Sequence, residues 1–534
     1  MNFIINKSIV MSMVFGLFIS GATIDSVLAS QELAEKQEVS LAVTAGDIGS
    51  ADPFASGMIQ DNLFIWHVFG SLVRYPIGDV TSGKIEPSLA TRWELSSDKL
   101  TWTFHLRKGV KWHWEHGEFT SEDVVYSINR VKNSKISAWR GSYETFKEVK
   151  AVDKYTIQVT TFKPDPYVLN KLSDSFGGFI VCKKAVEKAE AFDRSLRHMK
   201  EEVVGTGPFK FLEYRPKDRI VLVRNTDYWE GNPIIEKLTI RFIPDNTARE
   251  IAILKGEIHG YSGTTNQQWL THMRSKGILA PSMGPADLKA IYFNLRVKPF
   301  DNKKVREAFA YACSQESVAE MQGHDISQIA TSPVPSGTWG QVDAGWHRKR
   351  DIRKAKMLLA EAGYPNGLSV TCFMSIGWWY LDKMIIWQNE LKEAGIDLQM
   401  TKVDHTVYQQ KIRAGLNPFA IWGMAQPLAT NWLRNFYHSD SAIDRPKANH
   451  NFMYYSNPEV DKLIEMSEVT VDQKTLLEIL AKAQKIIVQD LPSIPVIETR
   501  TPKMIHPSLG LGYEPKSNFL YNLQIGPKTK LLKH

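Results

Sequence analysis

The sequence is poor in cysteine, with three among 534 residues: Cys182, Cys313 and Cys372. An odd and widely separated set forms no disulfide framework and lacks the spacing of a metal-ligand cluster. One bridge is compatible with an oxidising compartment, but three small buried hydrophobic side chains are the simpler expectation. The composition therefore excludes a small disulfide-stapled domain.

Long apolar runs and clusters of one charge are also missing. The apolar run at 9–19 is well short of the roughly 20 residues that a membrane-spanning helix needs. Basic residues outnumber acidic ones by only 65 to 58, for a formal charge of +7, and are spread along the chain. Because nucleic-acid-binding proteins cluster their basic residues, we expect no nucleic-acid partner.

Catalytic motifs are absent as well. No Gly-x-Ser-x-Gly elbow, Cys–His pairing or tight carboxylate pair stands out. The run 204–210 lacks the Gly-Lys-Ser/Thr ending of a phosphate loop, and a strand-like segment follows it, which favours a crossover between domains. His113 and His116 lack the helical spacing of a zinc motif, and a solvated loop is predicted there. We expect neither an enzyme nor a resident cofactor or metal.

The amino terminus, residues 1–29, has the features of a secretory signal peptide. Lys7 supplies a positive charge, an apolar run follows, and Val27-Leu28-Ala29 provides small residues at the cleavage positions. Cleavage is expected after Ala29. An amino-terminal membrane anchor is the alternative, but the short apolar run disfavours it.

The clearest local pattern lies at 86–130. Apolar residues from Leu100 to Leu106 alternate with polar ones and predict a strand, and 110–114 continues the alternation as a second extended segment. Thr120 and Asp123 have the spacing of a capping box, which predicts a helix starting there.

Similar patterns continue along the chain and predict an α/β protein. Further strands are expected at 39–43, 155–159, 220–223 and 240–243, and helices at 246–254, after the caps Asp301, Asp351 and Asn457, and at 476–487. One hydrophobic core does not usually serve 534 residues, so two or three domains are expected.

The amino-acid sequence of 86–124 resembles the family 5 extracellular solute-binding proteins, and so do further blocks at 204–229, 292–308 and 363–367. These are the peptide, nickel and opine receptors of ABC importers. The resemblance implies two α/β lobes in a periplasmic binding protein-like fold, with a small extra α/β domain on the first lobe. The implied organisation is a signal peptide at 1–29, lobe I at 30–66, 200–288 and 497–534, the small domain at 67–199, and lobe II at 289–496.

The implied function is capture of a peptide or peptide-like small molecule between the lobes. Hinge closure would bury the ligand and present the closed state to a permease in the inner membrane. No cysteine follows the signal peptide to carry a lipid, so a free, monomeric protein of the periplasm is expected.

The same resemblance marks ligand-binding candidates, most of them aromatic. Trp422 stands at the tryptophan of the family's Gly-Trp-x-x-Asp loop, and Asn451 matches an asparagine of the same loop system. The other candidates are Trp139, Arg140, Trp378, Trp379 and Trp432, with Asp52 and Phe54 as weaker ones in the loop after the first strand.

Ala425 departs from the family pattern. In relatives that bind peptides, the acid of that loop pairs with the peptide ammonium, and here Ala425 occupies its place. Losing this contact costs a free amino terminus roughly ten- to a hundredfold in affinity, which disfavours free di- and tripeptides. The alternative is that a gap shifts the loop and that Asp440 or Asp444 takes the role.

Two other functions stay open on the same fold. A nickel- or haem-type receptor would use histidine or arginine at the cleft, with His405 and His438 as candidates. An extracytoplasmic chaperone or sensor subunit would retain no small ligand.

Overall fold

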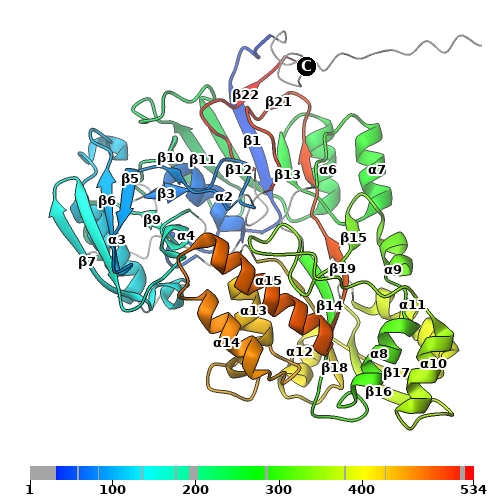
Figure 1. Ribbon diagram of the computed structural model, residues 1–534. Helices are drawn as coiled ribbons and strands as arrows, with labels where there is room; N and C mark the ends of the chain where they lie inside the picture. Colours follow the sequence, from blue (N-terminus) through cyan, green and yellow to red (C-terminus); the bar gives the residue numbers. More distant parts are fainter. Residues whose placement is uncertain are drawn as a thin grey trace, which may run out of the picture.

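The computed structural model describes residues 32–56, 59–81, 83–133, 135, 137–174, 177–191, 203–282, 287–377, 380–426, 428–517 and 523–533. The predicted signal peptide, Trp378 and Trp379 lie outside these residues. The molecule is elongated: strands of the amino-terminal third form one end, and helices from the second half of the chain form the other (Figure 1).

The first lobe is built on a six-stranded sheet of order β10-β11-β12-β1-β13-β20. Its strands are β1 (Glu38–Val43), β10 (Phe209–Arg215), β11 (Arg219–Arg224), β12 (Lys237–Phe242), β13 (Gly260–Ser262) and β20 (Lys503–Ile505). β1 is parallel to both of its neighbours, β12 and β13. Three helices lie beside this sheet: α2 (Ile59–Val68), α6 (Asn246–Leu254) and α7 (Gln267–Ser275) (Figure 1). Three separated parts of the chain therefore make one sheet.

The two ends of the described chain are joined on this lobe. The Gln37 side chain donates from Nε2 to the Leu531 carbonyl at 2.9 Å and accepts from the Leu531 N–H at 2.8 Å. Leu531 belongs to β22 (Lys530–Leu531), which pairs with β21 (Leu509–Gly510). A buried amide side chain thus pairs the first strand region with the last.

The small domain has an antiparallel sheet of order β5-β6-β8-β7. The strands are β5 (Ala90–Leu95), β6 (Thr101–Leu106), β7 (Phe146–Asp153) and β8 (Thr156–Thr161), and the adjoining elements are β2 (Gly70–Ser71), β3 (Val73–Arg74), β4 (Glu86–Pro87), α3 (Ser121–Asn133), α4 (Val168–Lys171), β9 (Phe179–Ile180) and α5 (Lys183–Ala191). The strand predicted from the alternation is confirmed as β6. The prediction of a second extended segment at 110–114 is wrong. The structure has there a single bridge between Lys111 and Glu118 and the short helix η1 (His113–Glu115).

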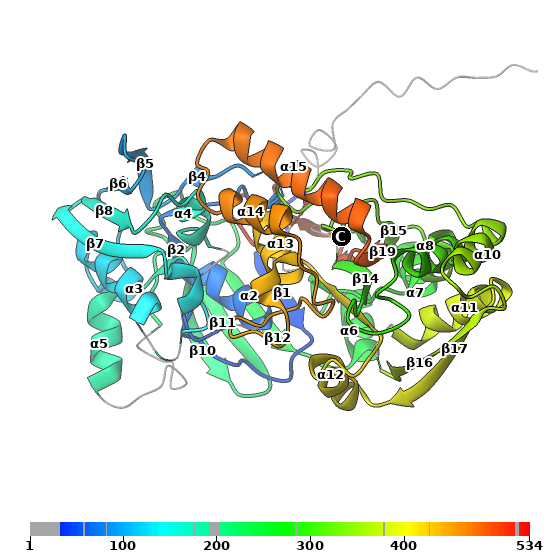
Figure 2. The ribbon, with the colours of Figure 1, turned by 60° about the horizontal axis from the view of Figure 1, so that its bottom comes forward.

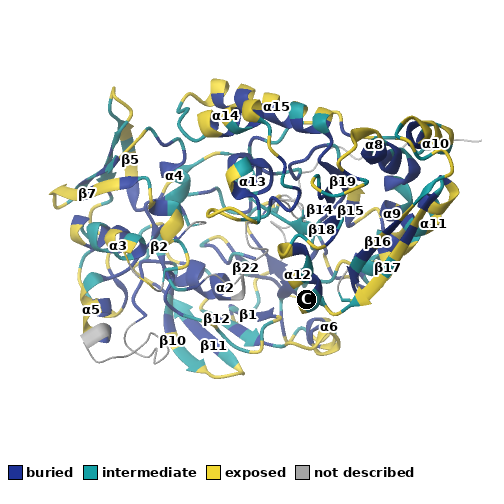
Figure 3. Cartoon of the chain, turned by 90° about the horizontal axis from the view of Figure 1, so that it is seen from below, coloured by how far each residue is buried: buried dark blue, intermediate teal, exposed yellow. Residues whose placement is uncertain are grey.

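The second lobe centres on a four-stranded sheet of order β15-β19-β14-β18. Its strands are β14 (Asp287–Phe293), β15 (Ser327–Ile329), β18 (Phe419–Met424) and β19 (Ser493–Thr499), beside the parallel pair β16 (Leu368–Ser375) and β17 (Ile396–Val403). The helices are α8 (Lys303–Ala312), α9 (Gln315–Gln322), α10 (Ile352–Glu361), α11 (Tyr380–Glu393), α12 (His405–Arg413), α13 (Ala429–Tyr437), α14 (Pro458–Ser467) and α15 (Gln473–Asp490). Figure 3 shows the central strands buried, with exposed residues on the outer faces of α14 and α15.

Helix starts follow the sequence closely. Asp123 accepts from the Thr120 N–H at 3.0 Å, which confirms the capping box, and Asp351 and Asn457 cap α10 and α14 as predicted. The cap predicted at Asp301 is wrong by one residue, because the Asn302 side chain accepts from the Lys304 N–H at 2.9 Å. The three cysteines are free and buried, as expected.

The segment around 205–207 packs tightly against the end of α2. A Cβ atom on Gly205 would lie 1.8 Å from the Val68 carbonyl oxygen, so only glycine permits this approach. His113 accepts from the Gly205 N–H at 3.3 Å and contacts the Gly207 carbonyl through Nε2 at 3.0 Å. The prediction of a solvated loop is therefore wrong for His113. This side chain is buried, and its two hydrogen-bond contacts hold the segment 205–207 in place.

Among the described residues, no helix has both the length and the apolar character that a membrane crossing requires.

Buried histidines should make the fold acid-sensitive. His67 accepts from the Ile525 N–H at 2.8 Å and contacts the Leu63 carbonyl, and burial lowers its pKa to about 4. Burial likewise lowers the pKa of His113 to about 4. The unfolded chain takes up these protons near pH 6.5 and the folded chain does not, so stability falls as the pH drops from 6.5 towards 4. Each histidine should cost roughly 2 kcal/mol of unfolding free energy between pH 7 and pH 5.

Urea unfolding of His67→Gln at the two pH values measures this effect, since an amide can make both contacts without titrating. Its loss of stability between pH 7 and pH 5 should be smaller than that of the unmodified chain by roughly 2 kcal/mol. His324→Gln, at an exposed position, is the control. An equal loss in His67→Gln and the unmodified chain would contradict the assignment.

Candidate functional site

A cleft separates the small domain from the second lobe. It encloses a cavity of about 770 Å³, with one wall from residues 138–171 and the other from residues 426–468. In Figure 2, α13, α14 and α15 lie between the small domain and the strands β14 to β19. Pockets at domain junctions of this size are common sites for small molecules.

The loop after β1 supports the first wall. Arg130 makes a two-pronged ion pair with Asp52, at 3.0 and 2.7 Å, and its guanidinium lies 5.4 Å from the centre of the Phe54 ring. The Ala138 N–H donates to the Phe54 carbonyl at 2.9 Å. The Asp52 carboxylate is thus held inside the protein, and the structure gives Asp52 and Phe54 the role of anchors.

Trp139 lies where the two hydrophobic cores meet. Its half-buried ring packs against both the core of the first lobe and small domain and the core of the second lobe. Its indole N–H donates to the Ser56 carbonyl at 3.1 Å. Arg140 is exposed and begins the short helix η2 (Arg140–Tyr143). Ala138 and Gly141, on either side of this pair, line the cavity.

The second wall begins with Gln426 in the loop after β18, and Trp422, on β18 itself, lies beside this wall without lining the cavity. The Trp422 ring lies 5.2 Å from the His450 ring and 5.4 Å from the Phe452 ring, centre to centre. The exposed Arg413 guanidinium lies 5.8 Å from the Trp422 ring centre. The Trp422 indole nitrogen is buried, and no residue that the structure describes accepts a hydrogen bond from it. The end of β18 therefore carries a buried, unpartnered indole N–H, with a cation from α12 close to its ring.

His450 is uncharged at neutral pH. Burial lowers its pKa to about 4, and the nearby positive charge of Arg413 acts in the same direction. The neighbouring Asn449, and Gln426 beside Ala425, both line the cavity.

Trp432 and Asn451 have packing roles. Trp432 is fully buried, donates to the Pro333 carbonyl at 2.7 Å and stacks on Phe436. The Asn451 amide donates to the His438 and Tyr455 carbonyls at 3.0 and 2.9 Å. Neither side chain lines the cavity. Their contact with ligand stays a prediction, as it does for Trp139, Arg140, Trp422 and Ala425, which do not line the cavity either.

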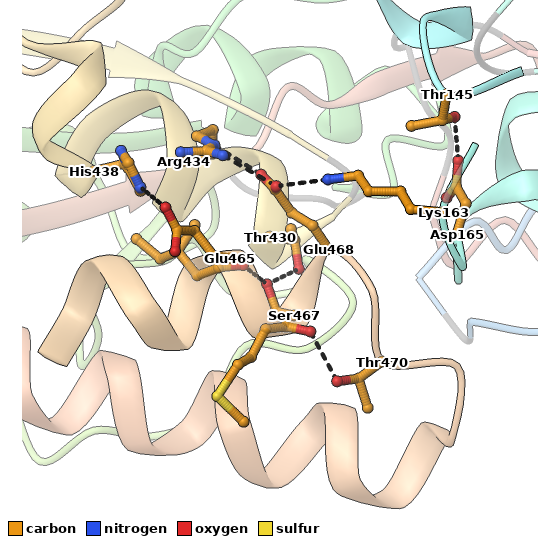
Figure 4. A network of polar contacts seen from close by, with 12 residues as sticks. Thr145, Lys163, Asp165, Thr430, Arg434, His438, Glu465, Ser467, Glu468 and Thr470 are labelled. Atoms are coloured by element: carbon orange, nitrogen blue, oxygen red, sulfur yellow. Dashed lines mark hydrogen bonds and ion pairs between the residues drawn. The ribbon is translucent and has the colours of Figure 1, made fainter. Parts of the chain in front are cut away.

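Charged side chains cross the cleft at a place that no motif marks (Figure 4). Glu468 accepts from Arg434 at 2.7 and 3.0 Å within the second lobe, and Lys163 of the small domain lies 3.8 Å from the same carboxylate. The Tyr167 hydroxyl is hydrogen-bonded to Thr430 across the same gap. These residues are hundreds of positions apart in the sequence, so local pattern could not have identified them.

Neither alternative acid replaces the one missing at Ala425. Asp444 pairs with Arg296 at 2.6 Å, and this contact lowers the pKa of its carboxyl. Asp440 is exposed, with Lys447 at 4.0 Å. Neither aspartate lines the cavity. The gap-shift alternative therefore finds no support in the structure.

One carboxylate does lie next to the loop, but a lysine neutralises it. Asp287 pairs with Lys289 at 2.5 Å, and both side chains lie against Gly423, where a Cβ would be 2.4 Å from Lys289 Cδ. The nearby Lys383 is buried, and burial together with the charge of Lys289 lowers its pKa to about 8. The Asp287 carboxylate is thus already paired with Lys289, and Lys383 is close to that lysine.

The two histidines considered for a metal have other partners. His405 contacts Ser375 and Gln409 at 3.2 and 3.1 Å, and His438 accepts from the Asp440 N–H at 3.1 Å. Within the described part of the chain, no three histidine, cysteine or acidic side chains come together as a metal site would require.

Known proteins share this architecture over nearly the whole chain. The family described as bacterial extracellular solute-binding proteins, family 5 Middle, matches residues 84–444. Heme-binding protein A of Haemophilus influenzae is 28% identical over 80% of this chain and 81% of its own length. The dipeptide-binding protein of Escherichia coli is 27% identical, over 83% of this chain and 85% of its own.

A solved structure gives a higher identity. MoaA of A. tumefaciens R10, in complex with mannopinic acid, is 32% identical with a TM-score of 0.75, covering 93% of this chain and all of that one. HbpA2 of Haemophilus parasuis, at 23% identity and a TM-score of 0.81, shares the fold. The family match over residues 84–444 and the shared fold agree, and the chain belongs to the family 5 bacterial extracellular solute-binding proteins.

Proposed function

We propose that this receptor of an ABC import system captures a small peptide-like solute that presents a carboxylate, and not a free α-ammonium, to the loop after β18. The observation that carries the proposal is the chemistry of that loop. Ala425 stands in place of an acid, and three positions before it Trp422 on β18 carries an unpartnered indole N–H, with the Arg413 guanidinium 5.8 Å from its ring centre. A donor and a cation together favour an anionic acceptor group.

The surrounding charges support this choice. On this wall of the cleft Glu468 is held by Arg434, and Asp287 beside the loop is held by Lys289. A ligand ammonium placed at the loop would therefore compete with cations already bound to these carboxylates. The structural relative with 32% identity was solved with mannopinic acid, an acidic ligand, which agrees with this preference.

Capture would use the two-walled geometry. Ligand contacts made with both walls exist only when the lobes are close together, so a bound solute favours the closed state by its differential affinity. The closed form, with its lobes in a defined relation, is the state that a membrane permease can recognise. Extracytoplasmic location and the monomeric state are parts of the same proposal.

Native mass spectrometry of protein purified without refolding tests the function directly. A discrete added mass over the denatured mass identifies the solute, and we expect an acid without a free α-ammonium. A bound metal or chromophore would instead indicate the nickel- or haem-type receptor. A protein that gains no mass and binds none of the acidic candidates would refute the proposal.

Restoring the acid should restore recognition of a free amino terminus. Ala425→Asp should bind alanyl-alanine roughly ten- to a hundredfold more tightly than the unmodified chain does, because the ammonium gains a charge-assisted hydrogen bond. Calorimetry with N-acetyl-alanyl-alanine is the matched control, and its affinity should not rise. Equal gains for both ligands would show that the added carboxylate does not act through the ammonium, and no gain for either would show that residue 425 does not face the ligand.

Removing the Arg413 cation should weaken binding of the natural solute. Arg413→Gln should lower the affinity for the solute identified above by roughly tenfold, the value of one hydrogen bond to a charged group. Arg353→Gln removes an equal charge from an exposed position on α10 and should leave the affinity unchanged. An unchanged affinity in Arg413→Gln would place the ligand carboxylate elsewhere.

A further inference from the structure

A basic segment leads into helix α10. Residues 347–356 hold six lysine and arginine side chains against one aspartate, so the expectation that basic residues are spread along the chain is wrong for this segment. Residues 347–354 and Tyr311 of α8 line an open hollow of about 690 Å³. The Lys354 ammonium donates to the Tyr311 hydroxyl at 2.9 Å and so fixes the segment to α8. Positive charge is thus concentrated at one place on the second lobe.

Part of this charge is neutralised within the protein. Arg350 pairs with Glu393, and His347 with Glu316, each at 2.9 Å. These pairs hold the two ends of the extended stretch before α10 against neighbouring helices of the lobe. Their charges contribute little to a field outside the protein.

Three other cations of the segment lack such pairs. The side chains of Lys349, Arg353 and Lys356 are exposed. Among the residues that the structure describes, no carboxylate forms an ion pair with any of the three. The aspartate of the segment, Asp351, caps α10 by accepting from the Lys354 N–H at 3.0 Å. An uncompensated group of cations therefore faces the solvent.

An exposed apolar side chain lies beside these cations. Met357 is exposed by 51% and follows Arg353 by four positions, so the two share one face of α10. Figure 3 shows exposed residues along this helix. We name Lys349, Arg353, Lys356 and Met357 the basic face. Cations around an apolar side chain match the boundary of an anionic bilayer, where the charges stay among the headgroups and the apolar group enters below them.

The position of the basic face leaves the solute cleft free. α10 lies at the end of the second lobe that is remote from the small domain (Figures 1 and 2). None of the residues of the basic face lines the cavity between the small domain and the second lobe. A surface that covers α10 therefore does not close the cleft.

We propose that the basic face is a docking surface for a membrane of anionic phospholipid. Contact there holds the receptor at the membrane that contains its permease, so that the search for the permease runs along a surface. The inference is independent of which solute the cleft binds, because the two sites share no residue.

Vesicle co-sedimentation of the purified protein tests the docking. The protein should bind vesicles of one part phosphatidylglycerol to two parts phosphatidylcholine, and should not bind pure phosphatidylcholine. Binding should fall steeply as the salt concentration rises from about 0.05 to about 0.5 M, because salt screens exposed charges. Glycerol 1-phosphate at millimolar concentration should not release the protein, since a single headgroup lacks the array of charges.

A triple variant locates the surface. Lys349→Gln/Arg353→Gln/Lys356→Gln should lower the affinity for the mixed vesicles roughly tenfold or more, because each cation near an anionic surface contributes roughly fivefold. Its unfolding temperature should equal that of the unmodified chain, since the three side chains are exposed.

The matched control removes the same charge elsewhere. Lys150→Gln/Lys255→Gln/Lys276→Gln alters three exposed positions on the small domain and the first lobe, and should retain most of the binding. The proposal is overturned if the protein does not bind the mixed vesicles, if pure phosphatidylcholine binds equally, if glycerol 1-phosphate releases the protein, or if both triple variants lose the same affinity. Binding to polyglutamate but not to vesicles would place an acidic protein partner on this face and would equally overturn the lipid assignment.

Discussion

The structure depends on two large hydrophobic cores, with a smaller third one around α6 and α7, and the two large cores meet at a junction where few side chains pack against both. Trp139 packs against both cores, and Tyr167 of the small domain packs into the core of the second lobe. Each lobe is held together by its own apolar burial, which is the dominant favourable contribution to folding. A cleft between the lobes can therefore change its width without exposing either core.

Charge is distributed in agreement with this division. The close ion pairs lie within a single wall, Arg434 with Glu468 at 2.7 Å and Lys171 with Asp165 at 2.5 Å. The pair that spans the gap, Lys163 with Glu468, is longer at 3.8 Å, and the lysine side chain is half exposed. Exposed pairs contribute at most about 1 kcal/mol, so this contact guides the approach of the lobes and costs little to break.

Local pattern predicted local structure well. The period-two alternation of 100–106 became β6, and the caps Asp351 and Asn457 were placed correctly, because a strand face and a helix start depend on neighbouring residues. The prediction for 110–114 was wrong because a tertiary contact determines the backbone there. His113 points inward and makes hydrogen-bond contacts with Gly205 and Gly207.

The site was predicted less completely than the fold. The positions that the resemblance marked, Trp139 and Ala425, stay predictions: they do not line the cavity themselves, although Ala138, Gly141 and Gln426 beside them do. The resemblance could not separate the half-buried Trp422 from the fully buried Trp432, since two tryptophans ten positions apart look alike without their surroundings. The residues that cross the gap, Lys163 and Glu468, are brought together only by the complete fold.

The pairing of Gln37 with Leu531 has a consequence for folding during synthesis. A chain made from its amino terminus cannot complete the first sheet until β20 at Lys503–Ile505 exists, and cannot join its ends until residue 531 follows. Domains generally fold as units as the chain emerges, and this lobe becomes a unit only at the last segment. The first lobe therefore stays unfinished until nearly the whole chain has been made, although the small domain and the second lobe have all their strands earlier.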